Sequence, residues 1–226
     1  MLKLTGISKT FRQRGVVLDN LELLLNEADM IAITGPSGSG KTTLLNLIGT
    51  LDRPDSGDIQ FRNTSILGFS SDQAAGYRNS HIGFVFQDHL LLPHLTIIQN
   101  IMLPVLARKS RKRDYQWSED YAVKLMDTVG IKDISGKFPF QISGGEAQRA
   151  ALIRALVNKP SVLLADEPTG SLDKDNAELL GELLLEVNTQ TGVALLLVTH
   201  SLSLAKKMAK SYHLEKGKLA VIETGM

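Results

Sequence analysis

Short apolar runs of strand length alternate along the chain with segments in which apolar residues recur at helical spacing. The runs that predict buried strands lie at residues 29–34, 161–165 and 193–198. The clearest helical periods lie at residues 42–51 and 172–191. Because these strands are apolar throughout, both faces of their sheet should be covered. The pattern predicts an α/β fold, with a mostly parallel sheet between layers of helices.

The two ends of the chain carry signals of a different kind. Short β-favouring pieces separated by turn residues predict an antiparallel patch beside the main sheet, at residues 2–7, 16–25 and 59–61. Residues 213–221 predict a closing hairpin that turns at Lys216 and Gly217. Asp173 is placed to cap the helix of residues 172–191, and Gly192 is placed to end it.

The middle of the chain interrupts the alternation of strands and helices. From residue 89 to residue 158 strand signals fade, and helical periods lie at residues 96–107 and 117–129. We therefore expect one domain over residues 1–226, with a core made of 1–88 and 159–226 and an inserted helical subdomain over 89–158. The basic run 108–113 favours a solvated loop, with contact to acidic lipid headgroups or to a partner as the alternative.

Composition narrows the class of protein. The chain has 226 residues, 43% of them hydrophobic and 22% charged, which is ordinary for a folded domain with a sizeable core. A net charge of +1 argues against a protein that wraps nucleic acid, so no nucleic-acid partner is expected. Without cysteine the chain has no disulfide, thiolate metal site or thiol nucleophile. No apolar run approaches the ~20 residues of a membrane-spanning helix, so a membrane role would require a partner.

A phosphate-binding loop of the form Gly-x4-Gly-Lys-Thr lies between the strand at 29–34 and the helix at 42–51. Its glycines let successive backbone N–H groups face a phosphate, and the helix N-terminus adds partial positive charge. Lys41 should reach the β- and γ-phosphates, and the Thr42 hydroxyl should bind Mg²⁺. The residues expected to touch the nucleotide are Gly35, Ser37, Gly38, Ser39, Gly40, Lys41, Thr42 and Thr43. Kinases and GTPases share such a loop, which leaves the enzyme class open.

Two acidic residues follow the buried strand at 161–165. Asp166 is placed to hold Mg²⁺ through water at the carboxyl end of a parallel strand. Glu167 is placed to polarise a water molecule that attacks the γ-phosphate. This pairing favours hydrolysis of ATP over transfer of its phosphate to a substrate. The other interpretation is an acidic pair that caps a helix before Pro168.

The segment 142–149 reads Ile-Ser-Gly-Gly-Glu-Ala-Gln-Arg and opens a helix that runs to about residue 158. It resembles the signature of ATP-binding-cassette (ABC) ATPases, Leu-Ser-Gly-Gly-Gln, with Ile for Leu and Glu for Gln. A serine hydroxyl, bare glycine amides and a helix N-terminus make a second anion site from Ser143, Gly144, Gly145 and Glu146. Two phosphate sites in one chain suggest that they face each other across a dimer. Without the resemblance, the same residues would read only as a helix N-cap.

Further motifs match the family in order and spacing, and the resemblance assigns each a role. It implies that Phe11 stacks on adenine and that Gln87 touches Mg²⁺ and links the core to the helical subdomain. It also implies that Asp173, in the motif 171–173, lies at the dimer interface, and that His200 contacts the γ-phosphate. The residues that it implies for catalysis are Glu167, His200, Gln87 and Lys41, and those for the metal are Thr42, Gln87 and Asp166.

The resemblance covers residues 11–200 and implies a P-loop NTPase (RecA-like) core with ATP and Mg²⁺ as ligands. The segments 78–87, 91–96 and 100–104 resemble the group of lipoprotein-releasing, peptide- and macrolide-exporting and cell-division ATPases, and the lipoprotein-releasing members most. The implied protein is a homodimeric ATPase that drives integral membrane permease subunits at the cytoplasmic face of the bacterial inner membrane. Two alternatives remain, a regulatory ATPase of the cell-division type and a soluble cassette ATPase. Cargo and direction do not follow from these residues.

The permease groove is expected in the helical subdomain. Apolar residues of segments 90–93 and 97–103 should form its floor, with burial in the core of the subdomain as the alternative for each residue.

Overall fold

The computed structural model describes residues 1–108 and 112–222 of the chain. Its larger sheet has six strands in the order β10-β9-β3-β8-β7-β6. The strands are β3 (Met30–Thr34), β6 (Ile82–Val85), β7 (Val162–Asp166), β8 (Ala194–Val198), β9 (Lys210–Glu215) and β10 (Lys218–Ile222). All neighbours from β9 to β6 run parallel, and β10 returns antiparallel to β9. The predicted parallel sheet and its closing hairpin are confirmed.

A second, antiparallel sheet has the strand order β2-β1-β4-β5. Its strands are β1 (Leu2–Phe11), β2 (Gly15–Leu25), β4 (Ser56–Phe61) and β5 (Thr64–Ser65). Alternate residues of β1 and β2 are buried, which is the expected pattern for a sheet with one covered face. The predicted antiparallel patch is therefore confirmed.

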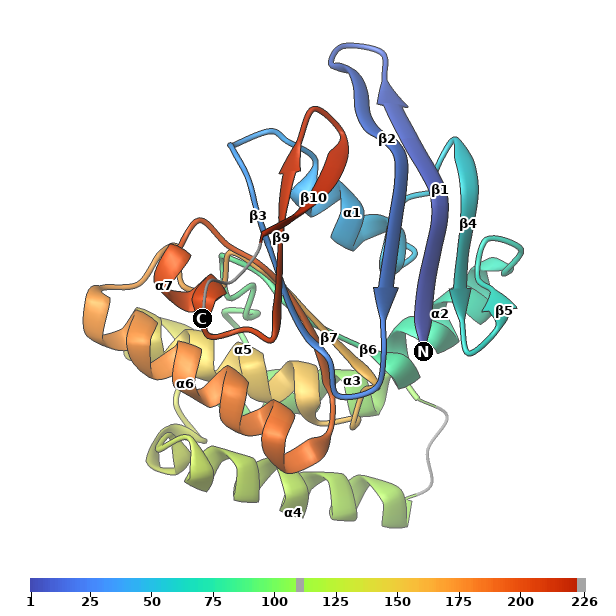
Figure 1. The fold of residues 1–226 in the computed structure, drawn as a ribbon. Coiled ribbons are helices and arrows are strands. Elements are labelled where there is room, and N and C mark those ends of the chain that lie inside the picture. The colour runs from blue at the N-terminus through green and yellow to red at the C-terminus, as the bar shows by residue number, and fades with distance from the viewer. Residues whose placement is uncertain (109–111, 223–226) are drawn as a thin grey trace.

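Two apolar cores lie on opposite faces of the larger sheet. In β7 and β8 successive residues alternate between them, so that Leu163 and Leu195 face one core while Leu164 and Leu196 face the other. This explains the continuous apolar runs, since neither face of these strands meets water. Figure 1 shows α1 (Lys41–Ile48) between the two sheets, and its apolar side chains belong to one core. The other core lies on the opposite face of the larger sheet, beneath which Figure 1 shows further long helices.

The helices differ in how well the sequence predicts them. Those on the far side of the sheet are α3 (Ile97–Leu106), α4 (Lys112–Thr128), α5 (Gly144–Leu156) and α6 (Lys174–Thr191), and a short α7 (Leu202–Lys206) follows β8. Asp173 caps α6 by accepting a hydrogen bond from the backbone N–H of Asn176, and Gly192 ends it at φ 70°, as the sequence predicts. The helix α2 (Ser71–His81) was not predicted, because Tyr77 is its only buried residue among those described and its apolar period is weak.

Between β6 and β7 the described residues contain helices and no strand. Ile97, Ile101 and Met102 are at most 1% exposed and belong to the core beneath the sheet. They cannot form the floor of a groove, and this part of the sequence-based expectation is wrong for them. The helix α4 begins at Lys112, earlier than expected, and residues 109–111 of the basic run 108–113 lie outside the described residues.

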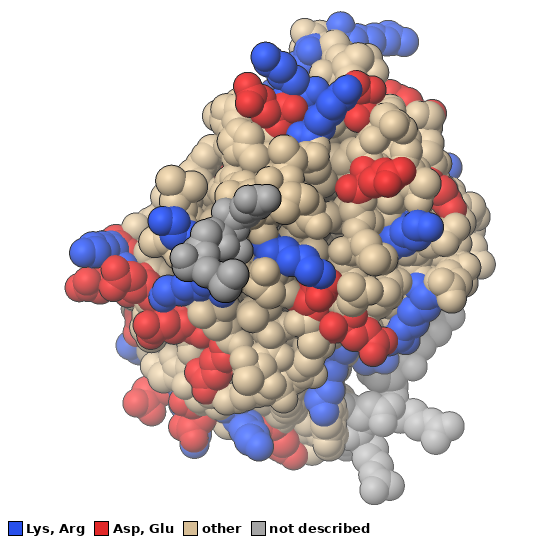
Figure 2. All heavy atoms as spheres, in the orientation of Figure 1, with Lys and Arg blue, Asp and Glu red and all other residues tan. Residues whose placement is uncertain are grey.

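No helix in the described part of the chain is long and apolar enough to cross a membrane. Figure 2 shows basic and acidic side chains intermingled over the visible face, in keeping with a net charge of +1.

Two glycines give a matched test of the packing. A Cβ at Gly83 in β6 would lie 2.5 Å from the Ala155 carbonyl oxygen of α5, whereas a Cβ at Gly76 in α2 would meet nothing within 4 Å. We expect Gly83→Ala to lower the free energy of unfolding by about 1–3 kcal/mol, because strand and helix must separate. Gly76→Ala should instead raise it by roughly 0.5–1 kcal/mol through helix propensity. Urea unfolding of both variants measures the difference, and equal effects would contradict this account of Gly83.

Candidate active site

The phosphate loop joins the end of β3 to the start of α1. Gly35 adopts φ 149° and Gly40 φ 105°, and a Cβ at Gly35 would collide with the Leu214 carbonyl of β9. Only glycine fits so close to the neighbouring strand at such a φ. No side chain caps α1 at Gly40. Its first backbone N–H groups are therefore available to an anion, as the sequence predicts for a phosphate site.

Lys41 is folded back onto this loop. Its side chain is buried, and Nζ donates hydrogen bonds to the carbonyl oxygens of Gly35 (2.9 Å) and Pro36 (3.0 Å). Burial lowers the pKa of the ammonium group, while the charges of Glu167 and Asp166 partly oppose that shift. The ammonium is thus held by weak neutral acceptors in the loop, from which it can turn to a phosphate oxygen at little cost.

Asp166 ends β7 beside the phosphate loop. Burial raises the pKa of this carboxyl, and a hydrogen bond from the Thr42 hydroxyl partly opposes the rise. Its Oδ1 atom and the Ser39 hydroxyl are buried without a hydrogen-bond partner among the described residues. Buried oxygen atoms without a partner call for an explanation, and a bound ion, water or ligand is one that fits this site. Thr42 and Asp166 offer oxygen donors, which suit a hard cation such as Mg²⁺.

The described residues contain no cluster of three or more His, Asp or Glu that could hold a metal alone.

Glu167 follows at the same sheet edge in a strained conformation, with φ 49°. Its backbone N–H donates to the Val198 carbonyl at 2.9 Å, which ties the turn to β8. One carboxylate oxygen accepts a hydrogen bond from the backbone N–H of His200 at 3.0 Å. The other lies 3.0 Å from His200 Nε2, but the two are not aligned for a hydrogen bond. The structure thus brings together the two residues that the sequence places 33 positions apart.

Gln87 is an exposed residue that follows β6. The Ser171 hydroxyl donates to its carbonyl oxygen at 3.1 Å, and its side chain lies against Gly170. Gln87 therefore lies beside the loop that connects Glu167 to α6, within one continuous site.

Phe11 lies at the other end of the phosphate loop. With Arg12, Gln13, Arg14 and Thr43 it lines an open cavity of about 350 Å³. Thr43 belongs to the first turn of α1, so an aromatic ring and the phosphate loop share one cavity. Ser37 and Gly38 are exposed in the same loop.

The signature residues form a second helix N-terminus. Ser143 caps α5, and its backbone N–H and hydroxyl both donate to the Glu146 carboxylate, at 2.7 and 2.8 Å. These hydrogen bonds lower the pKa of Glu146. Ser143 and Gly144 are exposed. Among the described residues no hydrogen bond or ion pair joins Ser143–Glu146 to the phosphate loop.

Sequence reasoning missed three polar residues that connect these motifs. Gln148 Nε2 donates to the Phe86 carbonyl at 2.6 Å, one residue before Gln87. Arg154 donates to the carbonyl oxygens of His89 and Leu90, both at 2.7 Å. These two donors from α5 hold the segment around Gln87 on both sides.

The third residue is Asn176, at the start of α6. It accepts a hydrogen bond from Arg149 at 3.3 Å, and Gly145 is packed so closely against it that a Cβ could not fit. Asn176 also donates to Asp173, which places the signature and the motif of Asp173 side by side. The sequence signals these contacts only by placing a polar residue within a predicted helix. Such a residue does not reveal which distant group it will bind in the folded chain.

The sequence profile of the family described as "ABC transporter" matches residues 18–170, more than half of the chain. This chain belongs to the ABC transporter family. It is 43% identical to the "lipoprotein-releasing system ATP-binding protein LolD 1" of Rhodopirellula baltica, over 97% of this chain and 96% of that protein. It is 39% identical to LolD of Bacteroides fragilis, over 97% of this chain and 100% of that protein.

Solved structures agree with the family. The ATP-binding cassette MJ0796, solved as a dimer in a post-hydrolysis state with ADP and Pi, superposes with a TM-score of 0.87 at 32% identity over all of both chains. CbiO1 of Clostridium perfringens superposes with a TM-score of 0.86 at 26% identity, over 97% of this chain and 86% of that one. The predicted P-loop NTPase fold is thereby confirmed. The chain is an ABC ATPase that binds and hydrolyses ATP and is homologous to the LolD group.

The raised pKa of Asp166 gives a test of the site without nucleotide. A carboxyl whose pKa is raised by folding contributes stability that is fully present below its ordinary pKa, 3.8, and is lost as pH rises through the raised value. Asp166→Asn removes the ionisation, so at pH 7 it should stabilise the nucleotide-free protein by roughly 1 kcal/mol. Urea unfolding should show this gain at pH 7 and a smaller gain as pH falls toward 4. The exposed control Asp127→Asn should change little, and a destabilised Asp166→Asn would contradict the account.

Proposed function

We propose that this ABC ATPase is the nucleotide-binding subunit of a lipoprotein-releasing transporter, and that two copies close around two ATP molecules. The observation that carries the dimer is the division of the site. One chain holds a phosphate loop with Asp166 and Glu167, and separately an exposed signature turn at Ser143 with no bond to that loop among the described residues. A second copy can present its signature turn to the open side of the phosphate loop. The dimeric MJ0796 relatives and the names of the LolD relatives support this assignment.

In this proposal each chain binds both the base and the phosphates of one ATP molecule. Phe11 stacks on the base, and the loop of residues 35–43 surrounds the phosphates with backbone N–H groups and Lys41. Thr42, Asp166 and Gln87 hold Mg²⁺, which neutralises charge on the phosphate oxygens when it is bound. From the second copy, the signature residues 143–146 and Asp173 complete the site.

Glu167 accepts the hydrogen bond of the attacking water in this mechanism. Its carboxylate is already oriented, because one oxygen is fixed by the His200 backbone N–H while the other makes no hydrogen bond among the described residues. The exposed imidazole of His200 lies beside that free oxygen and can contact the γ-phosphate. Oriented acceptors and donors of this kind contribute by positioning, which is the main source of catalysis in phosphoryl transfer.

The proposed site for the permease is a groove of about 980 Å³. It runs between α2, β6 and the end of α5, where the core of residues 1–88 and 159–226 meets the helical subdomain of residues 89–158. Its lining includes three arginines, Arg78, Arg108 and Arg154, and one carboxylate, Asp72. The sequence favours the segments 90–93 and 97–103 for this groove. The segment 90–93 contributes Leu90, whose side chain is 55% exposed. We propose that a cytoplasmic helix of the permease lies here and holds the ATPase at the cytoplasmic face of the inner membrane.

Replacement of Glu167 tests the chemistry. Glu167→Gln should bind ATP normally but lose ~10²–10⁴ in turnover, because the amide is a poor acceptor for the proton of the attacking water. Single-turnover hydrolysis measures the loss, and the exposed Glu182→Gln on α6 is the matched control. A rate for Glu167→Gln within about tenfold of wild type would remove Glu167 from this role.

The same variant tests the dimer, since blocked hydrolysis should trap it. Glu167→Gln with Mg-ATP should elute as a dimer from a sizing column and as a monomer without nucleotide. Adding Ser143→Arg should keep the protein monomeric while ATP still binds, because the signature turn is blocked and the phosphate loop is intact. A double variant that still dimerises would contradict the divided site.

A bulky residue in the groove tests the permease site. Gly76 lines the groove on α2, and a side chain there meets nothing within 4 Å. Gly76→Trp should keep basal ATPase activity within about twofold of wild type and abolish co-purification with the permease, because the indole occupies the helix site. Gly136→Trp, at a surface loop where a Cβ also meets nothing within 4 Å, should keep both. Normal co-purification of Gly76→Trp would place the permease elsewhere.

A further inference from the structure

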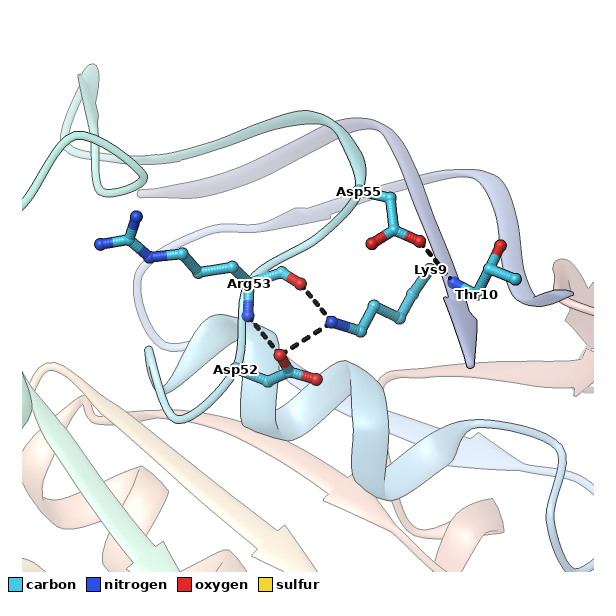
Figure 3. A network of polar contacts seen from close by, with 5 residues as sticks. All are labelled: Lys9, Thr10, Asp52, Arg53 and Asp55. Atoms are coloured by element: carbon cyan, nitrogen blue, oxygen red, sulfur yellow. Dashed lines mark hydrogen bonds and ion pairs between the residues drawn. The ribbon is translucent and has the colours of Figure 1, made fainter. Parts of the chain in front are cut away.

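A compact network of polar contacts surrounds Lys9 at the end of β1 (Figure 3). Lys9 Nζ donates to Asp52 Oδ1 at 2.8 Å and to the carbonyl oxygen of Arg53 at 2.6 Å. The Lys9 side chain is only 11% exposed, which is unusual for a lysine. An ammonium group kept this far from water requires partners such as these, so its geometry is fixed.

The network holds a stretch of β1 that still pairs with β2 but in an irregular register. The pairing of β1 with β2 shifts register between Ile7 and Lys9 and again after Lys9. On the other side, Asp55 takes over from β4, since its backbone N–H donates to the Ser8 carbonyl at 2.8 Å and its carboxylate accepts from the Thr10 N–H at 2.6 Å. Beyond the last β1–β4 pair, at Ser8, the segment that contains Asp52 and Asp55 therefore holds β1 on that side.

That segment is attached directly to the helix of the phosphate loop. The backbone N–H groups of Leu51 and Asp52 both donate to the Asn46 carbonyl of α1, at 2.8 and 3.3 Å. Asp52 thus connects α1, which begins at Lys41, with Lys9 on β1.

Lys9 also contacts Phe11, two residues further along. Its Nζ lies over the aromatic ring, 5.2 Å from the centroid, within the range of a cation–π interaction. Phe11 lines the cavity that it shares with Thr43 of α1. One ammonium group therefore touches the Phe11 ring and, through Asp52, is linked to Asn46 in the second half of the helix that follows the phosphate loop.

We propose that Lys9 is a positioning residue for the nucleotide base, which fixes the Phe11 ring at a set distance from the phosphate loop through Asp52. The inference rests on the proposed function, in which Phe11 stacks on the base. Lys9 should affect binding of the base and not of the phosphates. Among the described hydrogen bonds and ion pairs, Lys9 makes no contact with the loop of residues 35–42. A ring that is free to move would have to be ordered when ATP binds, which would weaken binding of the base but not of the phosphates.

The test compares a ligand with a base and one without. Lys9→Met keeps the aliphatic stem and removes the charge. Its Kd for Mg-ATP, by calorimetry, should rise roughly three- to tenfold, while its Kd for Mg-tripolyphosphate should stay within about twofold of wild type. The KM for ATP should rise with little change in kcat, because a positioning residue of the base takes no part in the transition state. Lys3→Met, an exposed lysine on the same strand, should change neither affinity.

Three further variants separate the possible outcomes: Phe11→Ala, the double variant of Phe11→Ala with Lys9→Met, and Asp52→Asn. Phe11→Ala should show the same selective loss, and Lys9→Met should add nothing to it in the double variant, since both act through one ring. If Phe11→Ala binds ATP normally, the proposed role of Phe11 fails and this inference fails with it. If Phe11→Ala binds ATP weakly but Lys9→Met does not, or loses tripolyphosphate equally, only the inference about Lys9 is overturned. Should Lys9→Met not fold, Asp52→Asn removes the charged link to α1 and decides by the same two affinities.

Discussion

The active site depends on a balance of buried charges at the carboxyl edge of the larger sheet. One ammonium group, on Lys41, and two carboxylates, on Asp166 and Glu167, meet where β3, β7 and β8 end. Lys41 donates to backbone carbonyls of its own loop, and Asp166 and Glu167 each keep one buried oxygen without a hydrogen bond among the described residues. Burial disfavours both the charged lysine and the charged Asp166, as their pKa shifts record. A fully paired cluster would be more stable but would leave nothing free for a nucleotide.

The backbone around these three charged residues is also held in conformations that keep the site open for a nucleotide. Gly35 passes so close to β9 that any side chain would collide with Leu214, and Glu167 is held at φ 49° by its hydrogen bond to Val198. Strain of about 1–3 kcal/mol persists at such a residue only where its surroundings fix the conformation. Here the hydrogen bond from Glu167 to Val198 and the close approach of Gly35 to Leu214 hold the two turns against neighbouring strands.

The helix α5 is attached to the carboxyl edge of the larger sheet by hydrogen bonds to backbone carbonyl oxygens near Gln87. Gln148 and Arg154 on α5 hold the segment on both sides of Gln87, and Ser171 holds Gln87 itself from the loop after Glu167. A shift of α5 must therefore move Gln87 relative to β7. Since the groove of α2, β6 and α5 adjoins the same segment, a partner seated there is mechanically connected to the site. These contacts form a continuous physical route from the groove to Gln87.

The sequence alone determined what depends on residues close together in the chain. Continuous apolar runs predicted the parallel strands, Asp173 and Gly192 marked the ends of α6, and the phosphate loop and signature indicated an ABC ATPase, because period, capping and backbone freedom are local properties. Tertiary structure alone decided the rest. It stabilised α2 by packing Tyr77 against Phe61, 5.3 Å between ring centroids, although the helix has little apolar period of its own. It also buried Ile97 and Ile101, where the pattern allowed a groove. The partners of Lys9, Gln148 and Arg154 lie 43 or more positions away, and a polar side chain does not reveal from sequence which distant carbonyl or carboxylate the folded chain will bring to it.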